Sequence, residues 1–256
     1  MLNGALIIEL VKRDFTERFA GSILGSAWAV IFPVVNLAIY IVVFGKIMGS
    51  RLEGASYLYA YSVYLTVGLL PWTAFANTLA RSTSVFIDTK HLISKMQISL
   101  PSLLVYIALS ETITFVVTLA FFLLFLLCTE FQFSMKLFLL PVLFYLQQVF
   151  AFGLGLFAAT MNVFIKDFKQ AVSVLLQVWF WLTPIVYLKE ILPVFFKKLL
   201  LYNPMYVIID TYQTIFIPQH EINYFALAIM AVLFHGIITA AYMIFRALEK
   251  DVRDFL

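Results

Sequence analysis

Long uncharged runs dominate the chain and predict membrane-spanning helices. Six runs lack Asp, Glu, Lys and Arg over most of their length, with Glu111 as an interruption. A helix needs about 20 apolar residues to cross a hydrocarbon core about 30 Å thick, and it satisfies its own backbone groups in lipid. No run alternates as barrel strands do. We therefore predict an all-α membrane protein, a single transmembrane domain with six transmembrane helices near 27–47, 57–80, 103–129, 137–163, 170–188 and 222–245.

The first 26 residues have a different pattern, with charges among the apolar positions. One set of apolar residues recurs at helical spacing, and polar residues lie largely opposite. Acidic residues among the bases argue against a cleaved signal. We predict an N-terminal amphipathic helix in the inner membrane interface; the alternative is an extension of the first span. The apolar set is Ile8, Val11, Phe15 and Phe19, and the polar set is Glu9, Lys12, Arg13 and Thr16.

The segment 81–100, between the second and third runs, is too apolar for a solvated loop. Phe86, Leu92, Ile93 and Met96 interrupt its polar residues. Such a patch covers lipid headgroups or docks into a groove on another protein. The alternative is a short interfacial helix without a partner.

The segment 189–221, between the fifth and sixth runs, is long and still rich in aromatic and aliphatic residues. Pro193, Pro204 and Pro218 divide it into short pieces. Long loops are usually functional or disordered, and this composition does not suit disorder. We predict two short outer helices, near 191–202 and 205–216, that cap a pathway or merely fill packing gaps.

The basic residues give the orientation. Eleven of the 17 Lys and Arg residues fall on one side if both termini share that side, and six fall on the other. Because cytoplasmic loops carry the excess of Lys and Arg, we predict both termini in the cytoplasm.

Composition narrows the chemistry. The chain is 63% hydrophobic and 12% charged, whereas soluble domains are about a quarter charged, so a single soluble domain is excluded. One cysteine, Cys128, excludes an internal disulfide and a thiol metal cluster. The sequence has no phosphate-binding P-loop and no His-Glu-x-x-His zinc motif. We therefore expect no enzyme activity, metal or cofactor in this chain, and no nucleic-acid partner.

Three features lie inside the runs. Ala151, Gly155 and Ala159 form a row of small residues, which predicts close helix packing. Glu111 is an intramembrane carboxyl group and so a candidate functional residue, but we expect it to be neutral or hydrogen-bonded to hydroxyls on a facing helix. We expect His235 to be a packed, hydrogen-bonded core residue.

Aromatic residues make up 17% of the chain, and some fall on common helix faces. Tyr57, Tyr61 and Tyr64 share one face of the second run by their spacing. Flat rings with polar tips suit a sugar chain that slides past them; the alternative is an aromatic belt at the membrane interface. The substrate-channel candidates are Trp28, Phe32, Tyr40, Tyr57, Tyr61, Tyr64, Trp179 and Trp181.

Several motifs, in order along nearly the whole chain, carry a family resemblance. They are Arg18-Phe-Ala-Gly-Ser-Ile-Leu-Gly-Ser-Ala-Trp28 with Pro33, Leu92-Ile93-Ser94-Lys95, Lys166-Asp167-Phe168, Thr183-Pro184-Ile185-Val186-Tyr187 and Tyr202-Asn203-Pro204. The chain resembles the type-2 ATP-binding-cassette exporter permeases, most closely the polysaccharide branch that exports O-antigen, capsule and teichoic acid. It departs from that pattern after Lys95, where Gln97-Ile-Ser-Leu-Pro101 lacks an arginine, and at Lys166, where arginine is common.

The resemblance implies a transport role. Two copies of the chain would pair, and two ATPase subunits would bind the inner face and hold the ATP and magnesium. The substrate would be a lipid-linked polysaccharide moved outward across a bacterial plasma (inner) membrane, with 189–221 as the exit gate. The N-terminal helix and the segment 81–100 would dock the ATPase, with these coupling candidates: Phe86, Asp88, Lys90, His91, Leu92 and Lys95.

Two other functions stay open. One is a lipid or drug exporter of the same superfamily. The other is an integral-membrane enzyme acting on a lipid-linked sugar, which would need a convergent catalytic set at one membrane surface. The sequence places Glu111 alone at depth and has no cluster of Asp, His or Arg in one loop.

Overall fold

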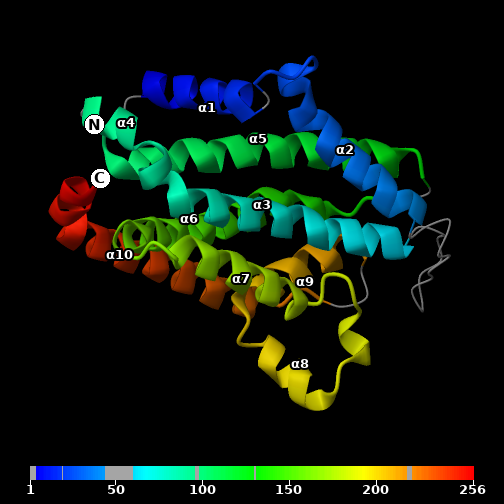
Figure 1. Ribbon diagram of the computed structural model, residues 1–256. Helices are drawn as coiled ribbons and strands as arrows, with labels where there is room; N and C mark the ends of the chain where they lie inside the picture. Colours follow the sequence, from blue (N-terminus) through cyan, green and yellow to red (C-terminus); the bar gives the residue numbers. More distant parts are fainter. Residues whose placement is uncertain (1–3, 19, 44–59, 96–97, 130, 218–220) are drawn as a thin grey trace.

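The computed structural model describes residues 4–18, 20–43, 60–95, 98–129, 131–217 and 221–256. Every regular element within these ranges is a helix, which confirms the predicted all-α class. Four long helices run side by side (Figure 1). They are α3 (Ala60–Asp88), α5 (Leu100–Leu127), α6 (Leu140–Phe164), which follows the 3₁₀ turn η3 (Met135–Leu139), and α10 (Tyr224–Phe255).

Four helices among the described residues are long and apolar enough to cross a membrane. They correspond to the second, third, fourth and sixth predicted spans, with bounds Ala60–Asp88, Leu100–Leu127, Met135–Phe164 and Tyr224–Phe255. The described part of the first predicted span is helical: after η1 (Gly25–Ala27), α2 (Trp28–Tyr40) continues as an apolar helix to Val43. The predicted limits at 47 and 57 lie outside the described residues.

The fifth predicted span, 170–188, is wrong as a continuous helix. Helix α7 (Phe168–Trp181) has 14 residues and ends well before Leu188. At 1.5 Å per residue it rises about 21 Å, less than the hydrocarbon thickness. Pro184 explains the break, because a proline disfavours the helical conformation of the residue before it.

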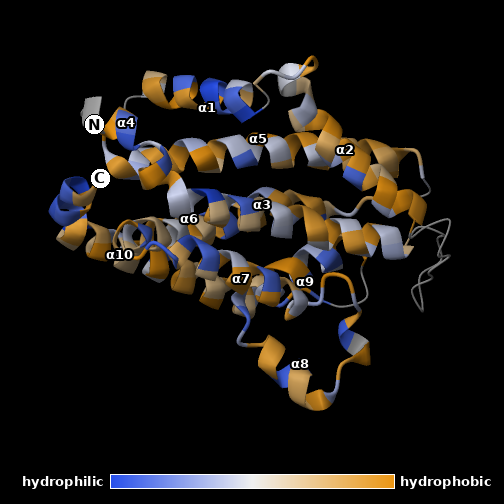
Figure 2. Cartoon of the chain, in the orientation of Figure 1, coloured by the Kyte–Doolittle hydropathy of each residue, from blue (hydrophilic) through white to orange (hydrophobic). Residues whose placement is uncertain are grey.

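The segment 81–100 is not one separate element. Helix α3 continues through Arg81 to Asp88, α4 (Lys90–Lys95) follows as a short helix, and α5 begins at Leu100. Figure 2 shows that polar residues gather on α1 (Gly4–Arg18), on α4 and at the C-terminal end of α10. Helix α4 and the end of α10 lie at the same end of the bundle (Figure 1).

Helix α1 forms where the amphipathic pattern predicts a helix, but it meets the protein through a different face. Ile7 and Leu10 are its buried residues, and α1 packs on α5. Ile8, which belongs to the predicted apolar stripe, is 59% exposed. Asp14, on the same side as Ile7 and Leu10, pairs with Arg81 of α3, so this side of α1 faces the bundle.

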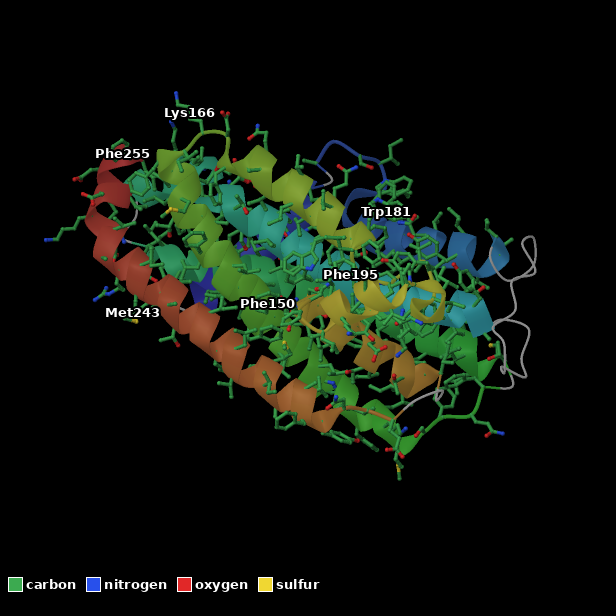
Figure 3. The ribbon with its side chains drawn as sticks, turned by 90° about the horizontal axis from the view of Figure 1, so that it is seen from below. Phe150, Lys166, Trp181, Phe195, Met243 and Phe255 are labelled. Atoms are coloured by element: carbon green, nitrogen blue, oxygen red, sulfur yellow. The ribbon has the colours of Figure 1, made fainter. Side chains whose placement is uncertain are left out.

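The two helices predicted in 189–221 differ in their packing. After η4 (Lys189–Ile191) comes α8 (Val194–Leu200), whose Val194, Phe195 and Phe196 are exposed. Seen from below, α8 with Phe195 lies in front of the bundle (Figure 3). Helix α9 (Pro204–Phe216) instead packs on α3, and most of its residues are buried, so it belongs to the core.

The row of small residues in α6 lets helices approach closely, as predicted. Ala151 and Ala159 are fully buried. A Cβ atom added at Gly155 would lie 2.7 Å from the Cβ of Ser82 on α3, and one at Gly153 would lie 3.0 Å from the Ile238 backbone on α10. The α3–α6 and α6–α10 contacts therefore require these glycines.

Gly155→Ala should destabilise the bundle by about 1–3 kcal/mol, because overpacking a tight contact forces the backbones apart. Gly236→Ala is the control, since nothing lies within 4 Å of a Cβ at that helical glycine. Thermal unfolding in detergent measures both variants. Equal transition temperatures for the two variants would show that α3 and α6 are farther apart at Gly155 than the structure has them.

Candidate functional site

Glu111 on α5 is buried, with 2% of its side chain exposed, and is held by two arginines. Its Oε1 atom lies 2.5 Å from Arg81 Nη1 and 3.2 Å from Arg18 Nη2. The amide of Asn77 donates a hydrogen bond of 3.3 Å to Oε2. A carboxylate out of water needs such partners, because an unpaired buried charge is costly.

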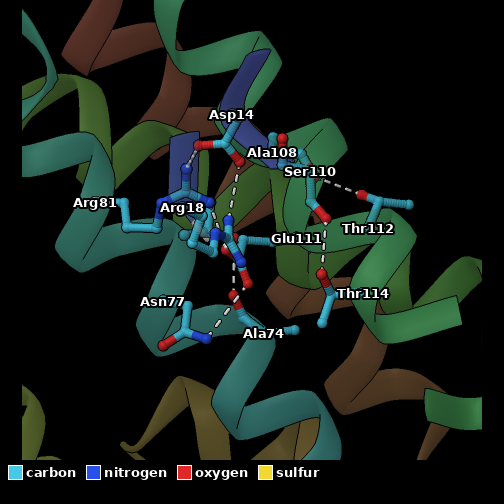
Figure 4. A network of polar contacts seen from close by, with 11 residues as sticks. Asp14, Arg18, Ala74, Asn77, Arg81, Ala108, Ser110, Glu111, Thr112 and Thr114 are labelled. Atoms are coloured by element: carbon cyan, nitrogen blue, oxygen red, sulfur yellow. Dashed lines mark hydrogen bonds and ion pairs between the residues drawn. The ribbon is translucent and has the colours of Figure 1, made fainter. Parts of the chain in front are cut away.

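Asp14 on α1 closes this set into a ring. It accepts a hydrogen bond of 2.9 Å from Arg18, one turn away, and it also pairs with Arg81. Each carboxylate therefore contacts both guanidinium groups, as Figure 4 shows. We call Asp14, Arg18, Arg81 and Glu111 the charge ring. It joins α1, α3 and α5 at one level of the bundle.

Hydroxyls on a facing helix were expected as partners of Glu111, and this is wrong within the described residues, where its partners are two arginines and the Asn77 amide. Thr112 and Thr114, which flank it, donate to carbonyls of their own helix at Ala108 and Ser110. The sequence pattern does not pair Arg18 or Arg81 with Glu111. The signal that would have found them is electrostatic: an acid at depth requires a base, and the short α3–α5 connection brings Arg81 to its level.

A cavity of about 380 Å³ lies beside the charge ring, between α2, α3 and α5. Arg18 and Glu111 form part of its wall, whereas Arg81 does not. The walls combine apolar, aromatic and hydroxyl or amide side chains. The lining residues are Arg18, Trp28, Ala29, Phe32, Pro33, Asn36, Leu37, Tyr40, Thr66, Leu69, Leu70, Thr73, Ala74, Asn77, Glu111, Thr114, Phe115 and Thr118.

Three of the predicted channel residues come together in this cavity. Trp28, Phe32 and Tyr40 all belong to α2 and line one wall. The ring centroids of Trp28 and Phe32 are 5.0 Å apart, and the Trp28 indole donates to the Ser22 hydroxyl at 2.8 Å. The arrangement presents ring faces beside hydroxyl groups, which suits an amphiphilic guest.

One polar group in the cavity wall is unsatisfied. The hydroxyl of Thr66 is buried and has no hydrogen-bond partner in the described part of the chain. The hydroxyl of Thr118 instead donates to the Thr114 carbonyl at 2.7 Å. Buried polar groups normally find partners, so Thr66 is an exception, but protein atoms cover its oxygen and it is not open to a guest in the cavity.

Tyr61 and Tyr64 lie elsewhere, at the break after α7. The Tyr64 hydroxyl lies 3.1 Å from the carbonyls of Pro184 and Tyr187, and Tyr61 donates to the carbonyl of Val186. Their hydroxyls thus hold the non-helical segment that follows α7. Tyr57, the third member of the predicted face, lies outside the described residues.

The remaining channel candidates face different ways. Trp179 packs against Phe75 with ring centroids 5.5 Å apart, and its indole donates to Asn203 at 2.8 Å. Trp181 is 60% exposed at the end of α7 (Figure 3). The structure therefore places the seven described candidates at four separate places and not along one wall.

The coupling candidates do not form one surface either. Phe86 is fully buried, with its ring centroid 6.2 Å from that of Phe245, so it is a core residue and cannot be a docking contact. Asp88, Lys90 and His91 are exposed, and Asp88 accepts a hydrogen bond of 2.6 Å from Ser84. Leu92 is half-buried, and the side chain of Lys95 lies outside the described set.

The expectation for His235 was half wrong. The residue is exposed on the α6–α10 face, not in the core. It is hydrogen-bonded: Nε2 lies 3.2 Å from the Tyr145 hydroxyl and Nδ1 lies 2.7 Å from the Ala231 carbonyl. Since a carbonyl only accepts, Nδ1 carries the proton and Nε2 accepts from Tyr145. Within the described ranges, no group of three His, Cys, Asp or Glu residues is placed to hold a metal ion.

Comparison with known proteins adds a family and several relatives. A family model described as ABC-2 type transporter matches residues 5–217. The O-antigen export system permease protein RfbA of Myxococcus xanthus is 27% identical over 251 residues, which cover 97% of this chain and 94% of that protein. RfbA of Klebsiella pneumoniae is 27% identical over 91% of this chain and 87% of its own length. The polysialic acid transport protein KpsM of Escherichia coli is 24% identical over 89% of each.

Proposed function

Because the chain belongs to the ABC-2 type transporter family, we propose that it is the permease subunit of an ATP-driven exporter. Its cargo is a lipid-linked polysaccharide, moved outward across a bacterial plasma (inner) membrane. The observation that carries this proposal is the cavity between α2, α3 and α5, where aromatic faces and hydroxyls lie beside a charge ring. The printed names of the relatives, O-antigen export and polysialic acid transport, support the same cargo class.

The proposed assembly follows from what the chain lacks. The sequence has no phosphate-binding P-loop, so in an ATP-driven exporter a partner ATPase would bind ATP and magnesium. The stoichiometry of two ATPase copies with two copies of this chain is part of the proposal and rests on the family. We propose six spans, with α2 as the first and α7 plus the segment after Pro184 as the fifth. Helix α9, held by Tyr61, Tyr64 and Asn203 through that segment, is then part of the exit gate.

The decisive experiment uses the chain together with its ATPase in proteoliposomes. ATP hydrolysis is measured with a lipid-linked glycan, with the same glycan freed from its lipid, and with the lipid alone. We expect stimulation by the linked form and ATP-dependent appearance of the glycan on the far side. Stimulation by phospholipid or small amphiphiles, with no response to any glycan, would assign a lipid or drug exporter. Chemical conversion of the lipid-linked sugar in the absence of ATP would instead identify the chain as an integral-membrane enzyme.

Orientation can be tested with single cysteines in a Cys128→Ser background, since Cys128 is itself exposed. Cysteines at exposed Ser134 and Lys198 should react with an impermeant thiol reagent added to intact cells, because both lie on the side poorer in Lys and Arg. Cysteines at exposed Lys90 and Asp254 should react only after permeabilisation. The reverse pattern would invert the topology and the direction of the exit gate.

Coupling can be tested at α4. Lys90→Glu combined with His91→Glu should reduce co-purification of the ATPase at least severalfold, because the change reverses charge on an exposed surface without disturbing the core. Lys198→Glu on α8 is the matched control. Equal ATPase recovery from both variants would move the docking surface away from α4.

A further inference from the structure

The cavity beside the charge ring has the form of a site for an amphiphile. We propose that it binds a phosphate-bearing lipid, with the apolar chain between α2, α3 and α5 and the phosphate on the guanidinium of Arg18. The identity of this lipid as the carrier of the exported glycan rests on the proposed function. The binding chemistry itself follows from the cavity.

Arg18 is the ring member that can turn to a ligand. Both ring arginines have 27% of their side chains exposed, but Arg18 lines the cavity and Arg81 does not. The contacts of Arg18 to Asp14 and Glu111, at 2.9 and 3.2 Å, are duplicated by Arg81, which contacts both carboxylates. Both acids therefore keep a partner when Arg18 leaves them.

The guanidinium group suits phosphate in particular. Its planar set of donors matches two phosphate oxygens at once, and it stays charged at every physiological pH. Arg81 carries the same group but does not line the cavity. The wall thus presents a guanidinium at one point, beside the end of α1.

The rest of the cavity fits an apolar chain. Its volume of about 380 Å³ falls within the range of small-molecule sites. Leu37, Leu69, Leu70 and Phe115 supply the apolar wall against which a hydrocarbon chain would pack. A phosphate head on Arg18 with a hydrocarbon tail on the apolar wall matches this division, while the Glu111 carboxylate in the same wall keeps its 2.5 Å ion pair with Arg81.

Binding should be measured by native mass spectrometry of the full chain with its ATPase. The probes are a long-chain polyprenyl phosphate, the polyprenol without its phosphate, and phosphatidylglycerol. Wild type should hold polyprenyl phosphate about tenfold or more tightly than Arg18→Gln does, the effect of losing charge-assisted hydrogen bonds. Polyprenol should bind both proteins equally and weakly.

Two further variants separate the loss of phosphate binding from a general loss of charge or of structure. Lys12→Gln removes a positive charge from an exposed site on α1 that does not line the cavity, so it should bind like wild type. Arg18→Lys keeps the charge but loses the planar donor set, so it should bind with intermediate strength even if Arg18→Gln loosens α1. Equal binding of polyprenyl phosphate by wild type and Arg18→Gln, or equal binding of polyprenol and its phosphate, would overturn the proposal.

The three lipid probes distinguish a carrier lipid from an ordinary phospholipid as the source of the bound phosphate. Arg18-dependent binding of polyprenyl phosphate alone supports a carrier site. If phosphatidylglycerol also binds in an Arg18-dependent way, the site recognises lipid phosphate in general and is not specific for the carrier of the glycan. If the assembled complex takes up none of the three lipids, neighbouring protein fills the cavity and the proposal is wrong. If Arg18→Gln binds the lipids as wild type does and the protein exports glycan, the lipid site is refuted and the proposed function stands. If lipid binding depends on Arg18 but the protein exports no glycan, the lipid site stands and the proposed function is refuted.

Discussion

Arg81→Gln is expected to lower the free energy of unfolding by about 3–5 kcal/mol, the range seen when one member of a buried ion pair is removed. Glu111, with 2% of its side chain exposed, would lose its shorter ion pair and keep only Arg18 and Asn77. Asp14 would lose a partner at the same time, so α1 would be held less firmly to α3 and α5. Denaturant or thermal unfolding of the purified protein in nanodiscs measures the loss.

Arg13→Gln is the matched control for this prediction. Arg13 pairs with Glu17 at 2.7 Å on the same helix, but the two side chains are 40% and 61% exposed. Exposed pairs contribute about 0–1 kcal/mol, so the control should lose far less. Similar losses for the two variants would show that Glu111 is not buried with its charge.

An exchange of charges distinguishes a ring from an isolated pair. In an isolated pair, Arg81→Glu combined with Glu111→Arg would restore the attraction. In the charge ring, the new carboxylate would face Asp14 and the new guanidinium would face Arg18, so like charges would meet. The double variant should therefore be no more stable than the single variants. Recovery of stability would argue that α1 takes no part in the ring.

Asn203→Ala should cost about 3 kcal/mol, combining a lost helix cap with lost buried hydrogen bonds. The Asn203 Oδ1 atom accepts from the backbone of Met205 at 3.1 Å and from the Trp179 indole at 2.8 Å. Its Nδ2 atom donates to the Thr183 hydroxyl at 2.9 Å. The residue thus caps α9 and fastens it to the end of α7.

Asn223→Ala provides the comparison. Asn223 also caps a helix, accepting from the Ala226 backbone at 2.9 Å, but it is exposed. Its loss should be about 1 kcal/mol, the usual effect of a cap. Hydrogen exchange across 182–203 should rise in the Asn203 variant alone. Equal stability losses and unchanged exchange would mean that Asn203 acts only as a cap.

The sequence predicted most of the helices because lipid imposes a simple rule on it. A long apolar run without charges has one stable form in a membrane, so α3, α5, α6 and α10 follow from run length. The small residues of α6 predicted close packing for a similar reason, since small side chains let backbones approach. The ordered motifs around Arg18, Thr183 and Asn203 were enough to indicate the transporter family that the family model then showed.

Only the tertiary structure decided which groups meet. Periodicity placed Tyr61 and Tyr64 on one face of their helix. Their hydroxyls bond the backbone carbonyls of Val186 and Pro184 because the helix α7 ends before Pro184 and leaves those carbonyls free of helical hydrogen bonds. Phe86 was predicted as a docking contact because it belongs to an apolar patch in the segment 81–100, yet it lies in the core because α3 continues through it. The charge ring is the clearest case. Its three segments, at Asp14–Arg18, Arg81 and Glu111, are far apart in sequence, and their pairing is set by the packing of α1 and α3 on α5, a long-range arrangement that no local pattern encodes.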